Sequence, residues 1–338
     1  MSKRVMRGLM VAIIVMLAIM VGMSINTSIE AFDKKEEVNY NYHFQVIVDK
    51  SMEKANRDDL IQGCKDSSED NGVYIEVIEA IDDEHKAEII DKAIYSKVDG
   101  LAFNVSNQSM ASKLAKKAKA MDVPIVNYGI SAYNDENIVN IHMTPYNIAS
   151  IMVKSVISEA KNVKLSKDDL ILVLLKECDT KDKKINNRLI KGFSKGISSK
   201  YKNNVKYIRV DAEGYDVSSK LKSQINKYKK ARIVVCFDDE YTNVASVLYS
   251  NKYREKISKK LTIIGYGTTN NNQDSIKEGK VKILYNVKQQ SLGYNSVEAL
   301  VDMKKKSDVD IKKYMPLFQK IQLNEENEME VNDLLVVK

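Results

Sequence analysis

The sequence predicts an α/β protein with two doubly wound parallel-sheet lobes, preceded by an N-terminal membrane segment. Three observations support this fold class. Short apolar runs alternate with segments whose apolar residues recur at helical spacing, this alternation occurs twice in succession, and residues 1–29 begin basic and then carry no charge. Alternating strands and helices are typical of parallel sheets covered by helices. A length of 338 residues also exceeds one ordinary core.

Residues 85–128 show the pattern most clearly. Apolar residues at helical spacing lead into the apolar run 101–103, which ends at Asn104. A second helical pattern follows, and the next strand, 125–128, ends at Tyr128. A connection of this length predicts a right-handed crossover between parallel neighbours. Because ligands of such sheets bind at the carboxyl ends of the strands, we expect a ligand near Asn104 and Tyr128.

Residues 1–33 are predicted to be a signal anchor or a signal peptide. Basic residues precede the segment 8–29, which contains no charged residue and approaches the length of a membrane-spanning helix. Cleavage after Ala31 would place the bulky Ile29 where a small residue is preferred, so an uncleaved anchor is favoured over a cleaved signal. In both cases the chain after a polar tether at 34–41 would lie outside the cytoplasmic membrane.

The first run of elements starts at a strand that ends in Asp49 and Lys50. The expected order is a strand at 44–48, a helix at 58–71, a strand at 73–80, the helix-strand-helix-strand stretch 85–128, a strand at 138–141 and a further helix. Gly72 after the first helix and Thr144-Pro145 before the last one are typical helix boundaries.

The pattern then begins again. The expected strands are 169–175, 205–210, 233–237, 261–266 and 283–287, and the expected helices are 183–198, 217–228, a helix through 244–248, 272–278 and 292–303. Two such runs imply two doubly wound lobes, and the crevice between them is the default ligand site.

Charge and cysteine patterns narrow the possible functions. The net charge of +7 comes from 53 basic and 46 acidic residues mixed along the chain, so lysine-rich pieces such as 113–119 and 304–306 are expected to be solvated helix faces. No nucleic-acid-binding motif accompanies them, and we expect no nucleic-acid partner. Cys64 and Cys236 are expected to be buried free thiols. The three histidines are too scattered to suggest a metal site, and no cofactor is expected.

Several motifs in a fixed order carry a resemblance to a known family. They are Val-Asp-Gly-Leu at 98–101, Val-Pro-Ile-Val at 123–126, Gly-Phe at 192–193, Phe-Asp-Asp-Glu at 237–240, Ile-Ile-Gly-Tyr-Gly at 263–267, Ser-Ile-Lys-Glu-Gly-Lys at 275–280 and Leu-Gly-Tyr at 292–294. Together they resemble the type I periplasmic (solute-) binding proteins, in particular the ribose- and galactose-binding group of sugar receptors. The resemblance covers about 44–303.

The resemblance implies two lobes joined by a three-segment hinge that close on a small ligand. It places lobe one at 42–143 plus 288–315, and lobe two at 144–287 plus 316–338. Domains of this family bind and release a ligand without catalysis, so no enzyme activity is expected.

Several ligand positions depart from the family pattern. Sugar receptors of this group usually have aromatic residues after strand one, but at the matching place this chain has Asn56 and Arg57. They also have an Asp-Arg pair after the Val-Pro strand, where this chain has Gly129 and Ile130. Gly267 stands where the family has the aspartate of a Gly-Phe-Asp turn. Each missing residue would supply a charge-assisted hydrogen bond or a face for the sugar ring.

Eight ligand-binding residues are nevertheless expected. The resemblance points to Asn56, Arg188, Tyr215 and Asp238, and the strand-end geometry points to Lys50, Asn104, Tyr128 and Asn286. Alternatives stay open at three of them. Tyr215 could be a surface tyrosine in a polar loop, Asp238 an ordinary helix cap and Arg188 a solvated helix arginine.

The leading hypothesis is an extracytoplasmic solute-binding protein that captures a sugar or similar small polar ligand for an ABC-type permease. The anchor and the altered sugar positions also allow a sensory role with a membrane sensor kinase. Transcription regulators of this fold need a helix-turn-helix module before strand one, where this chain has an apolar segment. An enzyme is disfavoured because no GxSxG elbow, no GxGxxG after strand one and no HExxH occurs.

Overall fold

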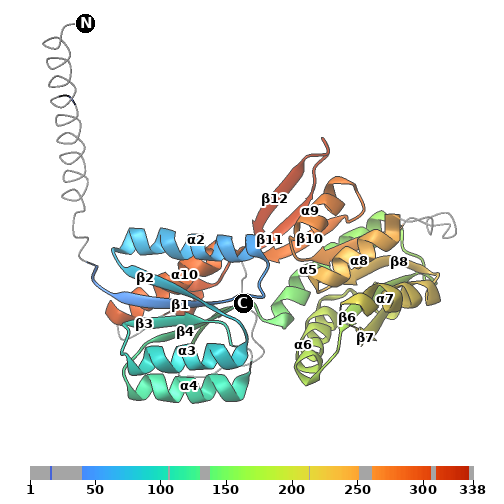
Figure 1. Ribbon diagram of the computed structural model, residues 1–338. Coiled ribbons are helices and arrows are strands. Elements are labelled where there is room, and N and C mark those ends of the chain that lie inside the picture. Colours follow the sequence, from blue (N-terminus) through green and yellow to red (C-terminus); the bar gives the residue numbers. More distant parts are fainter. Residues whose placement is uncertain are drawn as a thin grey trace, which may run out of the picture. The chain divides into compact units, whose positions relative to one another are not determined.

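Figure 1 shows a computed structural model of the chain. The structure describes residue 16 and residues 40–105, 107–129, 138–212, 214–250, 261–305 and 310–334. The chain divides into units 1–41 and 42–338, and every element below belongs to the second. The segment predicted at 1–33 lies outside the described residues except for residue 16. Within the described part, no helix has both the length and the apolar composition of a membrane span.

Five parallel strands form the first sheet. They are β1 (His43–Asp49), β2 (Tyr74–Ala80), β3 (Gly100–Phe103), β4 (Ile125–Gly129) and β5 (Val139–His142), in the order β2-β1-β3-β4-β5. All four residues of β3 are buried, as expected of a strand covered on both faces. The predicted parallel sheet is confirmed. Its order reverses beside β1, which makes the ends of β1 and β3 a natural ligand position.

Helices cover both faces of this sheet (Figure 1). On one face lie α3 (Asp83–Tyr95) and α4 (Gln108–Ala120), and on the other α2 (Lys54–Asn71) and α10 (Gln289–Lys305). The backbone N–H of His85 donates to Asp82 Oδ1 at 2.8 Å, which caps α3. Gly72 ends α2 with a φ of 61°, a conformation that favours glycine.

The second sheet repeats the strand order of the first. Its parallel strands are β6 (Leu170–Lys176), β7 (Val205–Val210), β8 (Ala231–Cys236), β9 (Thr262–Tyr266) and β10 (Ile283–Val287), in the order β7-β6-β8-β9-β10. Beyond β10 the sheet gains β11 (Phe318–Leu323) and β12 (Met329–Leu334), which pair antiparallel. The five parallel strands are the predicted parallel sheet, and the two antiparallel strands extend it at this edge, where β11 and β12 form a hairpin.

Helices also cover both faces of the second sheet. On one face are α5 (Pro145–Asn162) and α6 (Thr180–Gly196), and on the other α7 (Tyr215–Lys227), α8 (Asp239–Ser250) and α9 (Asn270–Lys277). Short 3₁₀ helices occupy Ser199–Asn204 and Ile311–Tyr314. The predicted two-sheet α/β architecture is thus confirmed.

Three segments cross between the sheets. The chain passes from β5 to α5, returns from β10 to α10, and passes again from the 3₁₀ helix at Ile311–Tyr314 to β11. Met143, Tyr314 and Phe318 lie on these crossings and belong to a buried cluster that includes residues of both sheets. We call the part around the first sheet the first lobe and the part around the second sheet the second lobe.

The predicted buried thiols are confirmed. Cys64 and Cys236 are both buried and free. Burial raises the pKa of the Cys64 thiol to about 12 and also raises the pKa of Cys236, so both behave as apolar core residues.

Candidate functional site

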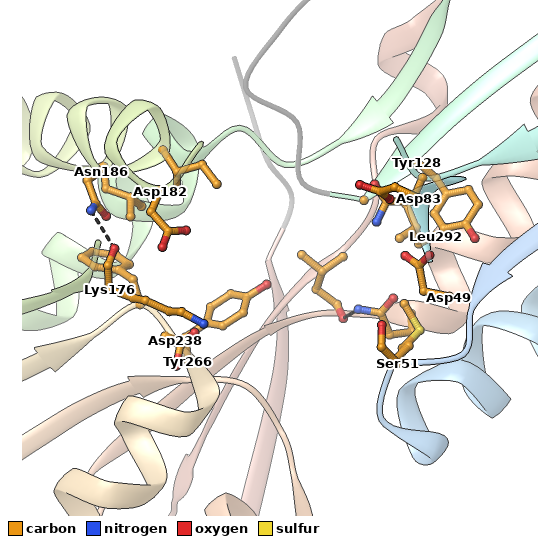
Figure 2. Close-up of a pocket in the computed structure, with 18 of the residues that line it drawn as sticks. Asp49, Ser51, Asp83, Tyr128, Lys176, Asp182, Asn186, Asp238, Tyr266 and Leu292 are labelled. Atoms are coloured by element: carbon orange, nitrogen blue, oxygen red, sulfur yellow. Dashed lines mark hydrogen bonds between the residues drawn. The ribbon is translucent and has the colours of Figure 1, made fainter. Parts of the chain in front are cut away.

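A pocket of about 630 Å³ is formed by residues at the carboxyl ends of strands from both sheets. Its size fits a small ligand. Apart from its tyrosines, its polar residues are Asp49, Ser51, Asp82, Asp83, Lys86, Asn104 and Gln289 from the first lobe, and Lys176, Asp182, Asn186 and Asp238 from the second. We call these two sets the first wall and the second wall. Figure 2 shows Asp49 and Asp83 on one side of the pocket and Asp182 and Asp238 on the other.

Lys86 holds the first wall together. It comes from α3 and is only 3% exposed. Its Nζ lies 2.5 Å from Asp49 Oδ1 and 3.2 Å from Asp83 Oδ1, and it donates to the carbonyl oxygen of Asn104 at 2.9 Å. The end of β1, the start of α3 and the end of β3 therefore meet at one ammonium group. A buried lysine needs such partners because burial disfavours an isolated charge.

Asn104, Tyr128 and Gly129 form the adjoining part of this wall. The Tyr128 hydroxyl donates to the carbonyl oxygen of Ile47 at 2.6 Å, and burial raises the pKa of this phenol well above its ordinary value. Gly129 has a φ of 106°, and a Cβ there would lie 3.2 Å from the Asn104 side chain. A glycine therefore suits both the backbone conformation and the space beside Asn104.

Asp238 lies on the second wall, after β8. Its Oδ1 accepts a hydrogen bond from the backbone N–H of Tyr241 at 3.0 Å, so it also caps α8. Burial raises the pKa of the Asp238 carboxyl to about 6, and the carboxylates of Asp239 and Glu240 act in the same direction. The Tyr241 N–H and the Lys176 ammonium act in the opposite direction. The pocket therefore holds a carboxylate that is costly to charge.

We expect Asp238→Asn to stabilise the protein at neutral pH. The folded state holds the Asp238 proton more tightly than the unfolded chain, so stability is lost as the pH rises from about 4 to about 6. Asparagine cannot titrate there but can still cap α8. The free energy of unfolding at pH 7 should rise by about 1–2 kcal/mol, and the gain should vanish near pH 4. Urea unfolding across pH 4–7 measures this; equal stability of both proteins at pH 7 would contradict it.

Asp182 and Asn186 come from α6. Asp182 Oδ2 accepts a hydrogen bond from the backbone N–H of Cys178 at 2.9 Å. Asn186 Nδ2 donates to the carbonyl oxygen of Lys176 at 2.8 Å, the contact drawn in Figure 2, and to Glu177 Oε2 at 3.2 Å. These bonds fix the start of α6 against the end of β6.

Three of the eight residues predicted from the sequence line the pocket: Asn104, Tyr128 and Asp238. The structure brings these together at the strand ends, as the strand-end argument expects. Their part in ligand binding stays a prediction.

The other five predicted residues lie outside the pocket lining. Lys50 is exposed in the turn after β1, and Asn56 bonds to Glu53 in the first turn of α2. Arg188 is exposed, on the solvent side of α6, and Tyr215 is fully exposed at the start of α7. Asn286 donates to Thr268 Oγ1 at 2.7 Å. Asn286 directly precedes the pocket residue Val287. Because successive side chains of a strand point to opposite faces of the sheet, Asn286 points to the other face.

Lys86, Asp182 and Asn186 are pocket residues that the sequence reasoning missed. Lys86 shares a helix face with the buried Ile89 and Ile90, three and four residues later. Asp182, Asn186 and the buried Leu189 follow the same helical spacing on α6. A polar residue on the apolar face of a predicted helix, near the helix start, was therefore the available signal.

No group of three or more potential metal ligands occurs within the part of the chain that the structure describes. The aspartates of the pocket are instead engaged with backbone N–H groups or with Lys86. The arrangement is suited to hydrogen bonding with a small polar molecule.

The family model of the periplasmic binding protein domain matches residues 46–307. This chain belongs to that family. Proteins of this family bind ligands outside the cytoplasm, and the fold of this periplasmic binding protein is that of the sugar-binding proteins of ABC transporters. A search of curated proteins finds no sequence match.

Solved structures show the same fold at low sequence identity. A sugar-binding protein of a sugar ABC transporter from Bacillus halodurans is 15% identical, with a TM-score of 0.67 over 86% of this chain and 97% of that one. AraP, an arabinose-binding protein from Geobacillus stearothermophilus, is 16% identical, with a TM-score of 0.64 over 86% and 96%. A LacI-type transcriptional regulator from Bacteroides fragilis, described as putative, is 16% identical, with a TM-score of 0.63 over 87% and 96%. These likenesses concern the fold alone.

Proposed function

We propose that this periplasmic binding protein captures a sugar or a similarly small polar molecule between its lobes and passes it to an ABC-type permease. One observation carries the proposal. The pocket is lined by carboxylates and amides from both lobes, so one ligand can bond to both lobes at once. Two similar structures are named as sugar-binding or arabinose-binding proteins, which supports a sugar as the ligand class.

The proposed mechanism is a ligand-driven hinge closure. A ligand held by Asp83 and Asn104 on the first wall and by Asp182 and Asp238 on the second favours whichever arrangement lets it touch both walls. The three crossing segments allow such a motion because few backbone positions have to change. An anchor at 1–33 would keep the protein near the permease at the outer face of the membrane.

Thermal unfolding of the purified chain tests the proposal. Neutral pentoses and hexoses, their amino derivatives and polyols are added singly, and at least one should raise the melting temperature. A ligand at about 100 times its dissociation constant adds about 2.7 kcal/mol of stability, which corresponds to a rise of several degrees in a protein of this size. No shift with any member of the panel would contradict the proposal.

Two variants show whether the ligand lies in this pocket. Asn104→Ala removes a pocket side chain, and Tyr215→Ala removes a fully exposed one outside it. With the stabilising sugar, we expect the first variant to lose most of the temperature rise and the second to keep all of it. The opposite result would move the site away from the strand ends.

A further inference from the structure

The charges of the pocket run against those of the whole protein. The chain has a net charge of +7, yet the pocket is lined by five aspartates and two lysines, with no arginine or histidine. The aspartates lie on both walls, as Figure 2 shows for Asp49, Asp83, Asp182 and Asp238. A ligand between the walls therefore meets an excess of negative charge.

The lysine of the first wall has no donor left for a ligand. An ammonium group has three N–H donors. The Nζ of Lys86 has three partners, namely Asp49 Oδ1 at 2.5 Å, Asp83 Oδ1 at 3.2 Å and the carbonyl oxygen of Asn104 at 2.9 Å. This wall consequently offers a ligand more acceptors than donors.

The second wall also offers acceptors to a ligand. Asp182 binds the N–H of Cys178 through Oδ2, and Asp238 binds the N–H of Tyr241 through Oδ1. Each carboxylate accepts several hydrogen bonds, so a second oxygen remains on each. Lys176 also lies on this wall, and its positive charge lowers the pKa of Asp238. It therefore compensates the negative charge of one of the two aspartates.

The first turn of α10 adds one further acceptor. Gln289 lines the pocket, and its Nε2 donates to the carbonyl oxygen of Val287 at 3.2 Å. Its Oε1 is buried and has no hydrogen-bond partner among the described residues. Buried acceptors normally have a hydrogen-bond partner, so an N–H donor of the ligand near Gln289 Oε1 would satisfy this atom.

We infer that the ligand carries a protonated amine beside its hydroxyl groups, as an amino sugar does. The inference rests on the proposed function, since it names the ligand class of the same pocket. A neutral sugar has at least twice as many lone pairs as hydroxyl protons, whereas the carboxylate oxygens of this pocket can only accept hydrogen bonds. Closing the walls around a neutral ligand would also bury an uncompensated negative charge, which an ammonium group neutralises.

Matched pairs of sugars test this inference with the full chain. D-glucosamine and D-galactosamine are titrated calorimetrically beside D-glucose, D-galactose and the two N-acetyl derivatives. We expect one amino sugar to bind at least about tenfold more tightly than its neutral parent and its N-acetyl form, as a charge-assisted hydrogen bond implies. Added salt should reduce this advantage.

The outcomes separate the inference from the proposed function. If a neutral or N-acetylated sugar binds as tightly as its amino form, the amine is not recognised and the inference fails, while the sugar-binding function stands. If none of the six sugars binds, the inference fails, and the proposed function fails with it only if the wider panel of pentoses, hexoses and polyols also gives no shift.

Two variants show whether the pocket carboxylates bind the amine of the ligand. Asp182→Asn removes a charge but keeps an oxygen for the N–H of Cys178, and Asp274→Asn removes an exposed aspartate outside the pocket. Asp182→Asn should weaken the amino sugar about tenfold and its neutral parent far less, and Asp274→Asn should change neither. An equal loss for both sugars would overturn the inference.

Discussion

Replacing Lys86 with methionine is expected to lower the free energy of unfolding by about 3 kcal/mol and to abolish ligand binding. Methionine fills much of the same space, so the change removes chiefly the charge and its three contacts. Asp49 and Asp83 then face each other without the ammonium group that lies 2.5 Å and 3.2 Å from them. Breaking a buried ion pair on one side costs about 3–5 kcal/mol, and the partial exposure of Asp49 argues for the lower end of that range. Urea unfolding and the sugar titration measure both effects.

The matched control for Lys86→Met is Lys92→Met. Lys92 belongs to the same helix, α3, but is exposed, so its loss should change stability by less than about 0.5 kcal/mol. The double variant Lys86→Met with Asp49→Asn should regain part of the lost stability, because it removes one of the carboxylates left unpaired. A double variant less stable than Lys86→Met alone would show that the ion pair is not what Lys86 contributes.

The two sheets could be predicted from the sequence because their strands are short apolar runs between helical patterns. The strand expected at 101–103 is β3 (Gly100–Phe103) in the fold, and Asn104 follows it directly, as predicted. The hairpin of β11 and β12 could not be predicted in the same way. Its second strand, β12, has the sequence MEVNDL, in which the apolar residues at 329, 331 and 334 do not keep the period of two that marks a strand, and it is largely exposed.

Of the four residues expected from strand ends, Asn104 and Tyr128 line the pocket, and Lys50 and Asn286 do not. In all, three predicted residues line the pocket: Asn104 directly after β3, Tyr128 near the end of β4 and Asp238 two residues after β8. A helical residue reaches the pocket only if its face of the helix does, and a shift of one residue turns the side chain by about 100°. Asn186 lines the pocket and Arg188, two positions later, is exposed. A position carried over from a family in an uncertain register therefore easily misses the pocket when it lies on a helix.

Replacing Gly63 with alanine is expected to destabilise the protein by about 3 kcal/mol or more, at the upper end of the cost of overpacking. In most helices this change is stabilising, by about 1 kcal/mol, because alanine favours the helix. Here the helices α2 and α10 pack backbone against backbone. A Cβ at Gly63 would lie 1.9 Å from the carbonyl oxygen of Gln290, and a Cβ at Gly293 would lie 2.0 Å from that of Leu60. Neither backbone can move aside alone, so the helices must separate. Urea unfolding of Gly63→Ala and the unaltered protein measures whether the free energy of unfolding falls or rises.

Lys65→Ala is the matched control for Gly63→Ala, since Lys65 is exposed on the same helix and its loss should be nearly neutral. The double variant of Gly63 and Gly293 should cost less than the two single variants added together, because one separation of the helices makes room for both methyl groups. The same separation should reach the ligand, since α10 carries the pocket residues Gln289 and Leu292. A stabilising Gly63→Ala would mean that α2 and α10 do not make this contact, and the first lobe would then need a different partner for the buried face of α10.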